Sequence, residues 1–179
     1  MRVAAPRAFL VLALQFAVAR SCIAQIGTTK DELIQRFGPC SPNPSGKPKG
    51  PNVYDSVLDV GEDCEFHSDS FRIVAFFKAG KVQSFDCAKE RTFWDSLLHG
   101  KSEPNPELTE DDISRLFRIV TPDLEWISVP SGEPIRRWRT SDSSAFAYYF
   151  AGGHYNRHWL FVHSAAVDAI YRGVARELR

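Results

Sequence analysis

The sequence has none of the short motifs that mark the commonest nucleotide-binding and metal-dependent active sites. It contains no G-x-G-x-x-G segment, no P-loop, no H-E-x-x-H and no C-x-x-C. It also has no excess of either charge, because 22 basic residues balance 22 acidic ones. These absences leave no recognisable catalytic constellation. They also argue against general nucleic-acid binding, which depends on positive charge to neutralise phosphates.

Long apolar runs are missing as well, apart from one close to the N-terminus. Residues Phe9–Val18 form an apolar stretch that follows Arg2 and Arg7 and precedes several small residues. The stretch is too short to span the roughly 30 Å of bilayer hydrocarbon. The layout is typical of a secretory signal peptide over residues 1–24. No other segment of the sequence approaches transmembrane length.

Two cleavage positions fit the rule of small residues shortly before the cut. Cleavage follows either Ala19 or Ala24, and a less favoured alternative places a lipid on Cys22. Loss of residues 1–24 removes three of the 22 basic residues, which leaves 19 against 22 acidic ones and a net charge of −3. We therefore expect an exported protein, periplasmic or secreted, with no membrane span after cleavage.

Cysteine is scarce, and only Cys40, Cys64 and Cys87 remain after either cleavage. Export places them in an oxidising compartment, where disulfides form. We expect one bridge among the three and favour Cys64–Cys87, because neighbouring strands can bring two Cα atoms to about 5.5 Å. The pair Cys40–Cys64 is the close alternative. The remaining cysteine could pair with Cys22 if cleavage is early.

The rest of the composition is that of a globular protein. The 179 residues are 44% hydrophobic and 25% charged, and this length accommodates one ordinary domain or two small ones. Thr29 with Glu32, and Thr109 with Asp112, have the spacing of capping boxes, and apolar residues at helical spacing follow each pair. We therefore expect two short helices that begin near residues 29 and 109.

Segments rich in β-branched and aromatic residues predict antiparallel strands. The run Phe66–Phe77, the turn Ala79-Gly80 and the run Val82–Cys87 predict a hairpin. Four further strand-like runs follow in the second half: Glu125–Val129, Ile135–Thr140, Ser144–Phe150 and Trp159–His163. The tail Val167–Gly173 fits either a fifth strand or a helix capped by Ser164.

The two halves of the chain follow a similar plan, in which a capped helix precedes strands and apolar residues recur with the same spacing. The matched residues are Phe77, Val82 and Phe85 in the first half and Val162, Val167 and Ile170 in the second. We therefore predict an α+β fold of two similar units, each a short helix packed on an antiparallel β-sheet. After the signal peptide, the first unit covers residues 25–103 and the second covers residues 104–179.

The first half resembles a known family. Residues 26–38 read Ile-Gly-Thr-Thr-x-x-Glu-Leu-Ile-x-x-Phe-Gly. This is similar to the start of the small outer-membrane-assembly lipoproteins (SmpA/OmlA) and of the β-lactamase-inhibitor-protein-like fold. There a short capped helix ends in Phe-Gly-Pro, and a strand, a glycine turn and a strand follow, as in residues 76–82. The inhibitor protein resembles this chain in being a secreted tandem repeat of this size, but no contact residues carry over.

Three histidines, His154, His158 and His163, form the strongest candidate metal-ligating group. On a helix, His154 and His158 would share one face, as zinc ligands do. The preceding glycines at 152 and 153 predict instead a hairpin loop, where residues four positions apart do not share one face. A metal-dependent or hydrolytic enzyme that uses these histidines is therefore the alternative function. We assign no catalytic residue, metal or cofactor.

Aromatic residues supply the candidate partner-binding surface. Most of the alternating aromatics in residues 144–150 fit a protein core, while Tyr149, Tyr155 and Trp159 are expected to form an exposed patch. Tyrosine and tryptophan are enriched at binding hot spots. We therefore expect a protein-binding module without catalytic activity, whose partner is another envelope or secreted protein.

Overall fold

The computed structural model describes residues 26–41, 62–92, 105–131, 135–151 and 158–177. The predicted signal peptide and the predicted boundary at residues 103 and 104 lie outside these ranges. In chain order the elements are α1 (Lys30–Phe37), β1 (Glu62–Ser68), β2 (Phe71–Lys78), β3 (Lys81–Lys89), α4 (Glu110–Val120), β4 (Trp126–Val129), β5 (Ile135–Thr140), β6 (Ala145–Phe150), β7 (Trp159–Ser164) and α5 (Ala165–Glu177). Among the described residues, no helix combines the length and apolar character needed to cross a bilayer.

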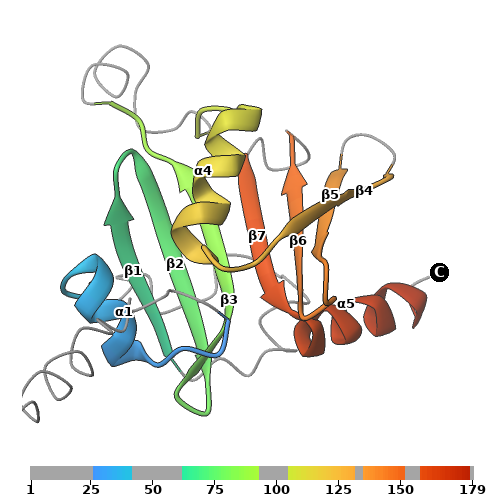
Figure 1. Cartoon of the computed structure of the whole chain (residues 1–179), viewed down its shortest axis with the longest axis horizontal. Coiled ribbons are helices and arrows are strands. Elements are labelled where there is room, and N and C mark those ends of the chain that lie inside the picture. The colour runs from blue at the N-terminus through green and yellow to red at the C-terminus, as the bar shows by residue number, and fades with distance from the viewer. Residues whose placement is uncertain (1–25, 42–61, 93–104, 132–134, 152–157, 178–179) are drawn as a thin grey trace, which may run out of the picture.

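One antiparallel sheet of seven strands runs through the molecule, in the order β1-β2-β3-β7-β6-β5-β4 (Figure 1). The last strands of the two halves, β3 and β7, pair directly from Ser84 with His163 to Cys87 with Leu160. The predicted α+β class is confirmed. The two halves contribute to a single sheet instead of forming one sheet each.

Helices α1 and α4 begin where the two capping boxes predict. The Thr29 hydroxyl accepts a hydrogen bond from the backbone N–H of Glu32, and the Glu32 carboxylate accepts one from the N–H of Thr29. Thr109 and Asp112 form the same reciprocal pair at the start of α4. Each pair satisfies two N–H groups that a helix start leaves without an internal partner.

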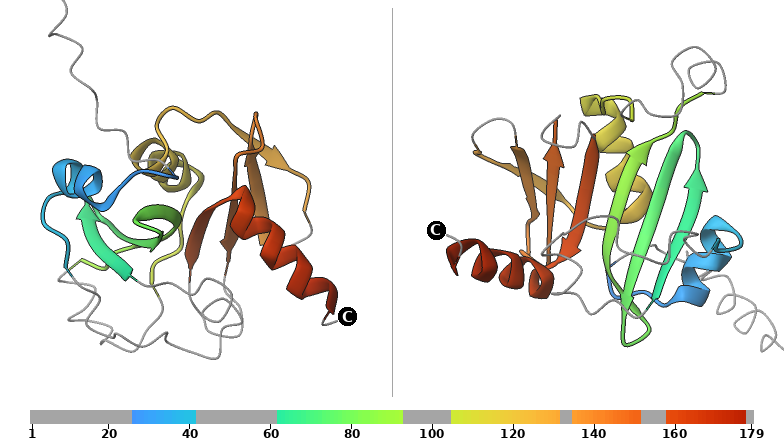
Figure 2. Two further views of the ribbon diagram at one scale, coloured as in Figure 1. Left: turned by 90° about the horizontal axis from the view of Figure 1, so that it is seen from below. Right: turned by 180° about the vertical axis from the view of Figure 1, so that it is seen from behind.

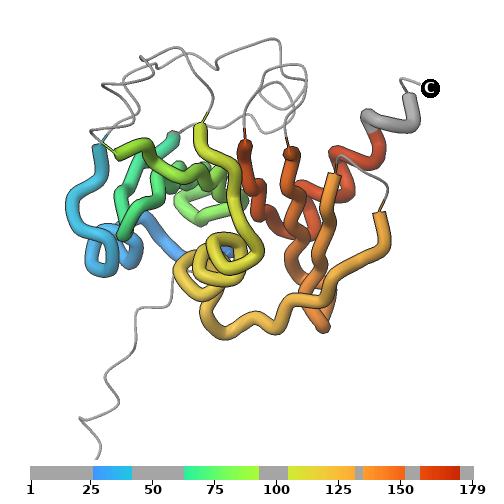
Figure 3. Tube along the Cα trace, turned by 90° about the horizontal axis from the view of Figure 1, so that it is seen from above, coloured from blue at the N-terminus to red at the C-terminus, as the bar shows by residue number. Residues whose placement is uncertain are grey.

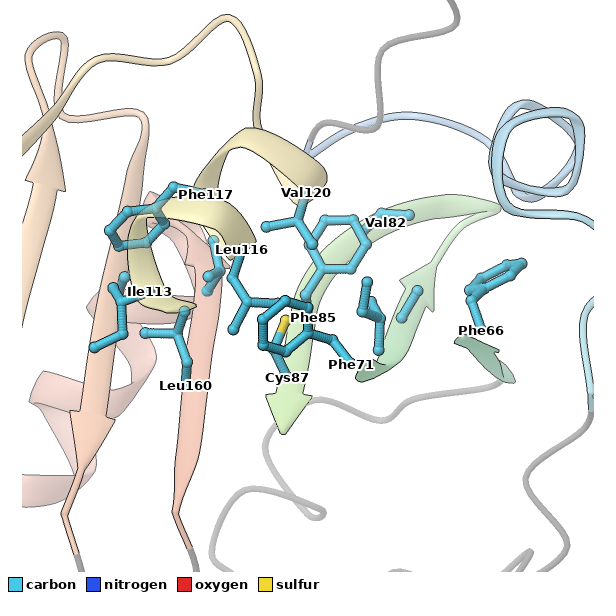
Figure 4. Packing of buried hydrophobic residues seen from close by; sticks show 14 of the residues in the cluster. Phe66, Phe71, Val82, Phe85, Cys87, Ile113, Leu116, Phe117, Val120 and Leu160 are labelled. Atoms are coloured by element: carbon cyan, nitrogen blue, oxygen red, sulfur yellow. The ribbon is translucent and has the colours of Figure 1, made fainter. Parts of the chain in front are cut away.

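The core is centred between α4 and the sheet (Figure 4). Ile113, Leu116 and Val120 of α4 are each at most 2% exposed, and their spacing of three to four residues gives one apolar helix face. They belong to one cluster with residues of the central strands, including Phe71, Phe85, Cys87 and Leu160. The predicted apolar face of this helix is confirmed.

The sheet has two faces, which we name after the helices that lie on them. The α4 face also carries α1, whose Leu33 is fully buried and whose Phe37 ring lies 5.5 Å from that of Phe66. Helix α5 lies on the opposite side (Figures 2 and 3), where Tyr148 of β6 contacts Asp168 of α5. Because side chains alternate along a strand, every strand contributes to both the α4 face and the α5 face.

The C-terminal segment forms the helix α5, so the structure selects the helix over the alternative prediction of a fifth strand. The Ser164 hydroxyl accepts a hydrogen bond from the N–H of Val167 at 3.4 Å, so Ser164 caps the helix. Val167 and Ile170 lie on α5. The spacing that matched them and Val162 to Phe77, Val82 and Phe85 therefore does not reflect a second hairpin like the one in the first half. The cap and the alanines at 165 and 166 favour helix over strand here.

The disulfide joins Cys40 to Cys64, whose Cα atoms are 5.5 Å apart. The favoured Cys64–Cys87 bridge is wrong, because the predicted single strand Phe66–Phe77 is two strands. A turn at Asp69, with φ of 56°, separates β1 from β2. Strand β2 therefore lies between Cys64 on β1 and Cys87 on β3.

Cys87 is a free, fully buried thiol near the middle of the sheet. Its backbone pairs with Ile73 on one side and with Leu160 on the other. Burial, and secondarily the nearby charge of Asp86, raise the pKa of the Cys87 thiol well above its usual value. The thiol therefore stays neutral and packs as a small apolar side chain.

Candidate functional site

The α5 face carries a group of aromatic side chains that the core does not fully cover. These residues come from β6 and β7 and are each half-buried: Phe146, Tyr148, Phe150, Trp159 and Phe161. We call this group the aromatic patch. The Phe161 ring lies 5.5 Å from that of Phe150 and 6.4 Å from that of Trp159. The patch therefore forms one continuous surface across two paired strands.

The sequence Ala-Phe-Ala-Tyr-Tyr-Phe of β6 explains why the patch lies on this face. Its small residues, Ala145 and Ala147, are fully buried on the α4 face. Strand alternation then places Phe146, Tyr148 and Phe150 on the α5 face. The same alternation places Trp159 and Phe161 of β7 beside them.

Three arginines lie over rings of the aromatic patch. Arg72 is 5.8 Å from the centre of the Trp159 ring, and Arg137 is 5.6 Å from that of Tyr148. Arg172 is 5.1 Å from the centre of the Phe146 ring. Such cation–π contacts hold arginines flat against aromatic rings and combine charge with apolar area.

The arginines differ in whether a carboxylate neutralises them. Arg72 forms an ion pair with Glu65, and Arg172 forms one with Asp168. Arg137 is exposed. Among the described residues, its side chain contacts the Tyr148 ring and no carboxylate. Arg137 therefore adds to the patch a positive charge that no ion pair of the described residues neutralises.

A buried polar network fixes α5 to the sheet at one end of the patch. Asp168 is 3% exposed, and its Oδ1 accepts a hydrogen bond from the Tyr148 hydroxyl at 2.6 Å and lies 3.4 Å from His163 Nε2. Its Oδ2 lies 2.6 Å from Nε of Arg172. Both carboxylate oxygens are thus engaged, and a cavity of roughly 60 Å³ lies between the sheet and Tyr171.

Ionisation in this network favours an anchoring role. Burial of Asp168 favours its neutral form, but the hydrogen bonds from His163 and Tyr148 and the charge of Arg172 outweigh burial, so the pKa of Asp168 lies below its usual value. Burial and the bond to Asp168 raise the pKa of Tyr148 to about 12. At neutral pH the network is therefore an ionised carboxylate held by a neutral phenol and an arginine.

The predicted patch of Tyr149, Tyr155 and Trp159 needs correction. Tyr149 is 1% exposed and points to the α4 face, where its hydroxyl accepts a hydrogen bond from the N–H of Leu108 at 3.1 Å. Trp159 points to the α5 face, so it cannot share a surface with Tyr149. Tyr155 lies outside the described residues. Of the three, Trp159 belongs to the aromatic patch as the structure has it.

The predicted histidine group is not assembled either. His158 lies on the α4 face with its Nδ1 3.2 Å from the Tyr149 hydroxyl, whereas His163 lies on the α5 face. The sheet therefore separates these two rings, which overturns a metal site that uses both. His154 lies outside the described residues. Within the described ranges, no three histidine, cysteine or acidic side chains are grouped as metal ligands.

A second hollow, of about 260 Å³, lies between α4 and strands β4 and β5. Its aromatic lining packs on itself: the Phe117 ring lies 4.3 Å from that of Trp126 and 5.7 Å from that of Trp138. The indole N–H of Trp126 donates a hydrogen bond to the Thr121 hydroxyl. These contacts hold α4 against the end of the sheet.

The sequence did not point to Phe161 or to the three arginines of the patch. The prediction that most aromatics of residues 144–150 belong to the core is wrong for Phe146, Tyr148 and Phe150, which are half-buried on the patch. The alternation in Trp-Leu-Phe-Val-His could have placed Phe161 beside Trp159. Arg72 and Arg172 could not have been found in this way, because they reach the patch from β2 and α5.

Comparison of the chain with known proteins finds no matching family model, no matching curated protein and no matching solved structure. The aromatic patch is therefore the feature of the molecule that bears on its function.

Proposed function

We propose that this protein is exported to the periplasm or the extracellular space and there binds another envelope or secreted protein, without catalysing a reaction. The observation that carries the proposal is the aromatic patch on the α5 face. It presents tryptophan, tyrosine and arginine together, the three residue types most enriched at binding hot spots. It also lies on paired strands, so little backbone freedom would be lost on binding.

Two features support export. The N-terminal sequence has the layout of a signal peptide. The Cys40–Cys64 disulfide fits an oxidising compartment, because reducing conditions in the cytosol keep most thiols free.

The proposal includes the two-unit origin of the fold and its similarity to the small outer-membrane-assembly lipoproteins and the β-lactamase-inhibitor-protein-like fold. Support comes from the repeated order of a capped helix followed by antiparallel strands. The two sets of strands meet at β3 and β7, the last strand of each set. A duplication that joined two small sheets edge to edge would give this order and would enlarge a core that is marginal in one unit alone.

The deciding experiment compares residues 25–179 with the variant Trp159→Ala. Both proteins are incubated with an envelope or culture-medium fraction of the producing cells, and the bound proteins are identified by mass spectrometry. Affinity is then measured with the purified partner. We expect Trp159→Ala to weaken binding about thirtyfold, because truncation of a hot-spot tryptophan costs at least about 2 kcal/mol.

Two matched variants separate binding from folding. Trp159→Phe keeps an aromatic ring and should recover most of the affinity. Ile170→Ala removes an exposed apolar side chain from α5, away from the patch, and should leave the affinity unchanged. Equal binding of the partner by wild type and by folded Trp159→Ala would refute the assignment of the patch.

A further inference from the structure

Strand β4 ends the sheet, and its outer edge carries backbone groups without a strand partner. The N–H of Ser141 donates to the carbonyl of Glu125 at 3.1 Å, just before β4 begins. In an antiparallel pair, hydrogen-bonded and non-hydrogen-bonded residues alternate. Ile127 and Val129 therefore bond to β5, while the backbone groups of Trp126 and Ser128 point outward.

The strand at the other end of the sheet, β1, is bridged at one residue of its outer edge. Ser41 bridges to Glu65 of β1 through two backbone hydrogen bonds of 3.1 and 3.0 Å. The adjacent disulfide between Cys40 and Cys64 holds this bridge in place. The β4 edge has no such bridge among the described residues.

Positive charge lies on β5, one strand in from the open edge. Arg137 and Arg139 of β5 pair in register with Val129 and Ile127 of β4, and all four side chains lie on the α5 face. Arg139 donates a hydrogen bond to the Ser143 hydroxyl, and Arg137 contacts the Tyr148 ring. Neither arginine has a carboxylate partner among the described residues.

We propose that the β4 edge binds an extended acidic segment of the partner protein as an eighth strand of the sheet. A strand added beyond β4 lies about 10 Å from β5, two strand spacings away. To meet glutamates of that strand, Arg137 and Arg139 must leave their contacts with Tyr148 and Ser143 and extend across β4. Ile127, which is 40% exposed, supplies apolar contact on the same face. This inference rests on the proposed function, because it takes the partner to be a protein.

Charge favours an acidic segment over a second copy of this chain as the occupant. Edge-to-edge pairing of two β4 strands would bring Arg137 and Arg139 of each copy onto one face across the seam. These arginines would lie three strand spacings apart, about 14 Å, and would gain no charge pair from the second copy. An acidic segment instead gains charge pairs on the α5 face while its backbone bonds to Trp126 and Ser128.

The test uses two fluorescent peptides and purified residues 25–179. The first peptide is Thr-Val-Glu-Val-Glu-Val-Thr, and in the second lysine replaces both glutamates. Binding is measured by fluorescence anisotropy, and hydrogen exchange of the Trp126 and Ser128 amides is followed by NMR. We expect the acidic peptide to bind more tightly and to slow exchange at both amides. Equal affinity for the two peptides would overturn the acidic specificity.

Ser128→Pro tests the backbone pairing directly. Proline removes the outward N–H of Ser128 and leaves the bonds to β5 intact, as proline does on natural edge strands. We expect about a tenfold loss of acidic-peptide affinity from the missing hydrogen bond and the altered edge. Ser128→Ala should bind as wild type does. Unchanged binding by a folded Ser128→Pro protein would overturn the added-strand geometry.

Arg137→Glu combined with Arg139→Glu tests the charge without touching the edge backbone. This double variant should lose affinity for the acidic peptide and gain affinity for the lysine peptide. If sedimentation instead shows concentration-dependent dimers that Ser128→Pro abolishes, self-pairing replaces the proposed occupant. Trp159→Ala should still bind the acidic peptide. If the patch does not bind the partner, Trp159→Ala keeps its affinity for the partner; if the β4 edge does not bind an acidic strand, the wild-type protein itself does not prefer the acidic peptide.

Discussion

Two neighbouring tyrosines on β6 show how differently the faces of the sheet are used. Tyr149 lies on the α4 face, is 1% exposed and accepts a backbone hydrogen bond from Leu108. Tyr148 lies on the α5 face, is half-buried and contacts Asp168 and Arg137. The first face is sealed by α4 and carries stability. The second leaves aromatic and charged groups partly exposed.

The largest expected difference between the faces is in packing. Leu116→Ala removes a fully buried side chain of α4 and should lower the free energy of unfolding by about 3 kcal/mol. Phe150→Ala, on the aromatic patch, should lower it by only about 1 kcal/mol, because that ring is already half-exposed. Urea unfolding of both variants measures the difference. Equal losses would mean that the α5 face is as much a core as the α4 face.

A smaller difference is expected when only the hydroxyls of the two tyrosines are removed. Tyr149→Phe leaves the N–H of Leu108 buried without a partner and should cost about 2 kcal/mol. Tyr148→Phe should cost about 1 kcal/mol, because Asp168 keeps Arg172 and water can reach the half-exposed ring. Each free energy comes from chemical denaturation at neutral pH. The reverse order would contradict the assignment of the faces.

The smallest expected effect depends on pH and concerns the anchor of α5. The pKa of Asp168 is lower in the folded protein than its usual value of 3.8. Its contribution to stability is therefore fully present above that value and is lost as the pH falls through the folded pKa.

Asp168→Asn tests this pH dependence. The variant should be less stable than wild type at pH 7, and the gap should narrow as the pH falls below 3.8. Unfolding followed from pH 7 to pH 3, together with helix content by circular dichroism, measures the gap. A gap that stays constant over this range would show that the charge of Asp168 does not hold α5.

The starts of α1 and α4 and the buried face of α4 were predictable from the sequence, because short sequence motifs determine them. Both capping boxes and the apolar face of α4 depend on residues within two helical turns. The turn between β1 and β2 was missed, because Asp69 interrupts a run that is otherwise typical of one strand. Aspartate tolerates the positive φ that such a turn needs, and that was the available signal.

The long-range features could not be read from the sequence in the same way. The pairing of β3 with β7 joins residues far apart in the chain. That pairing, and the position of α4 above it, decide which side of β6 is buried. Alternation predicted two faces for residues 145–150, but Tyr149 could be assigned to the core only once α4 was placed.

The free thiol of Cys87 is a reactive group inside the core that a thiol reagent can label. Because the side chain is fully buried between α4 and the central strands, a thiol reagent can reach it only when that core opens. In a chain that begins at residue 25, Cys40 and Cys64 are oxidised, so Cys87 is the single alkylation target. The rate of its labelling in native buffer would then report how often the molecule opens, without any denaturant.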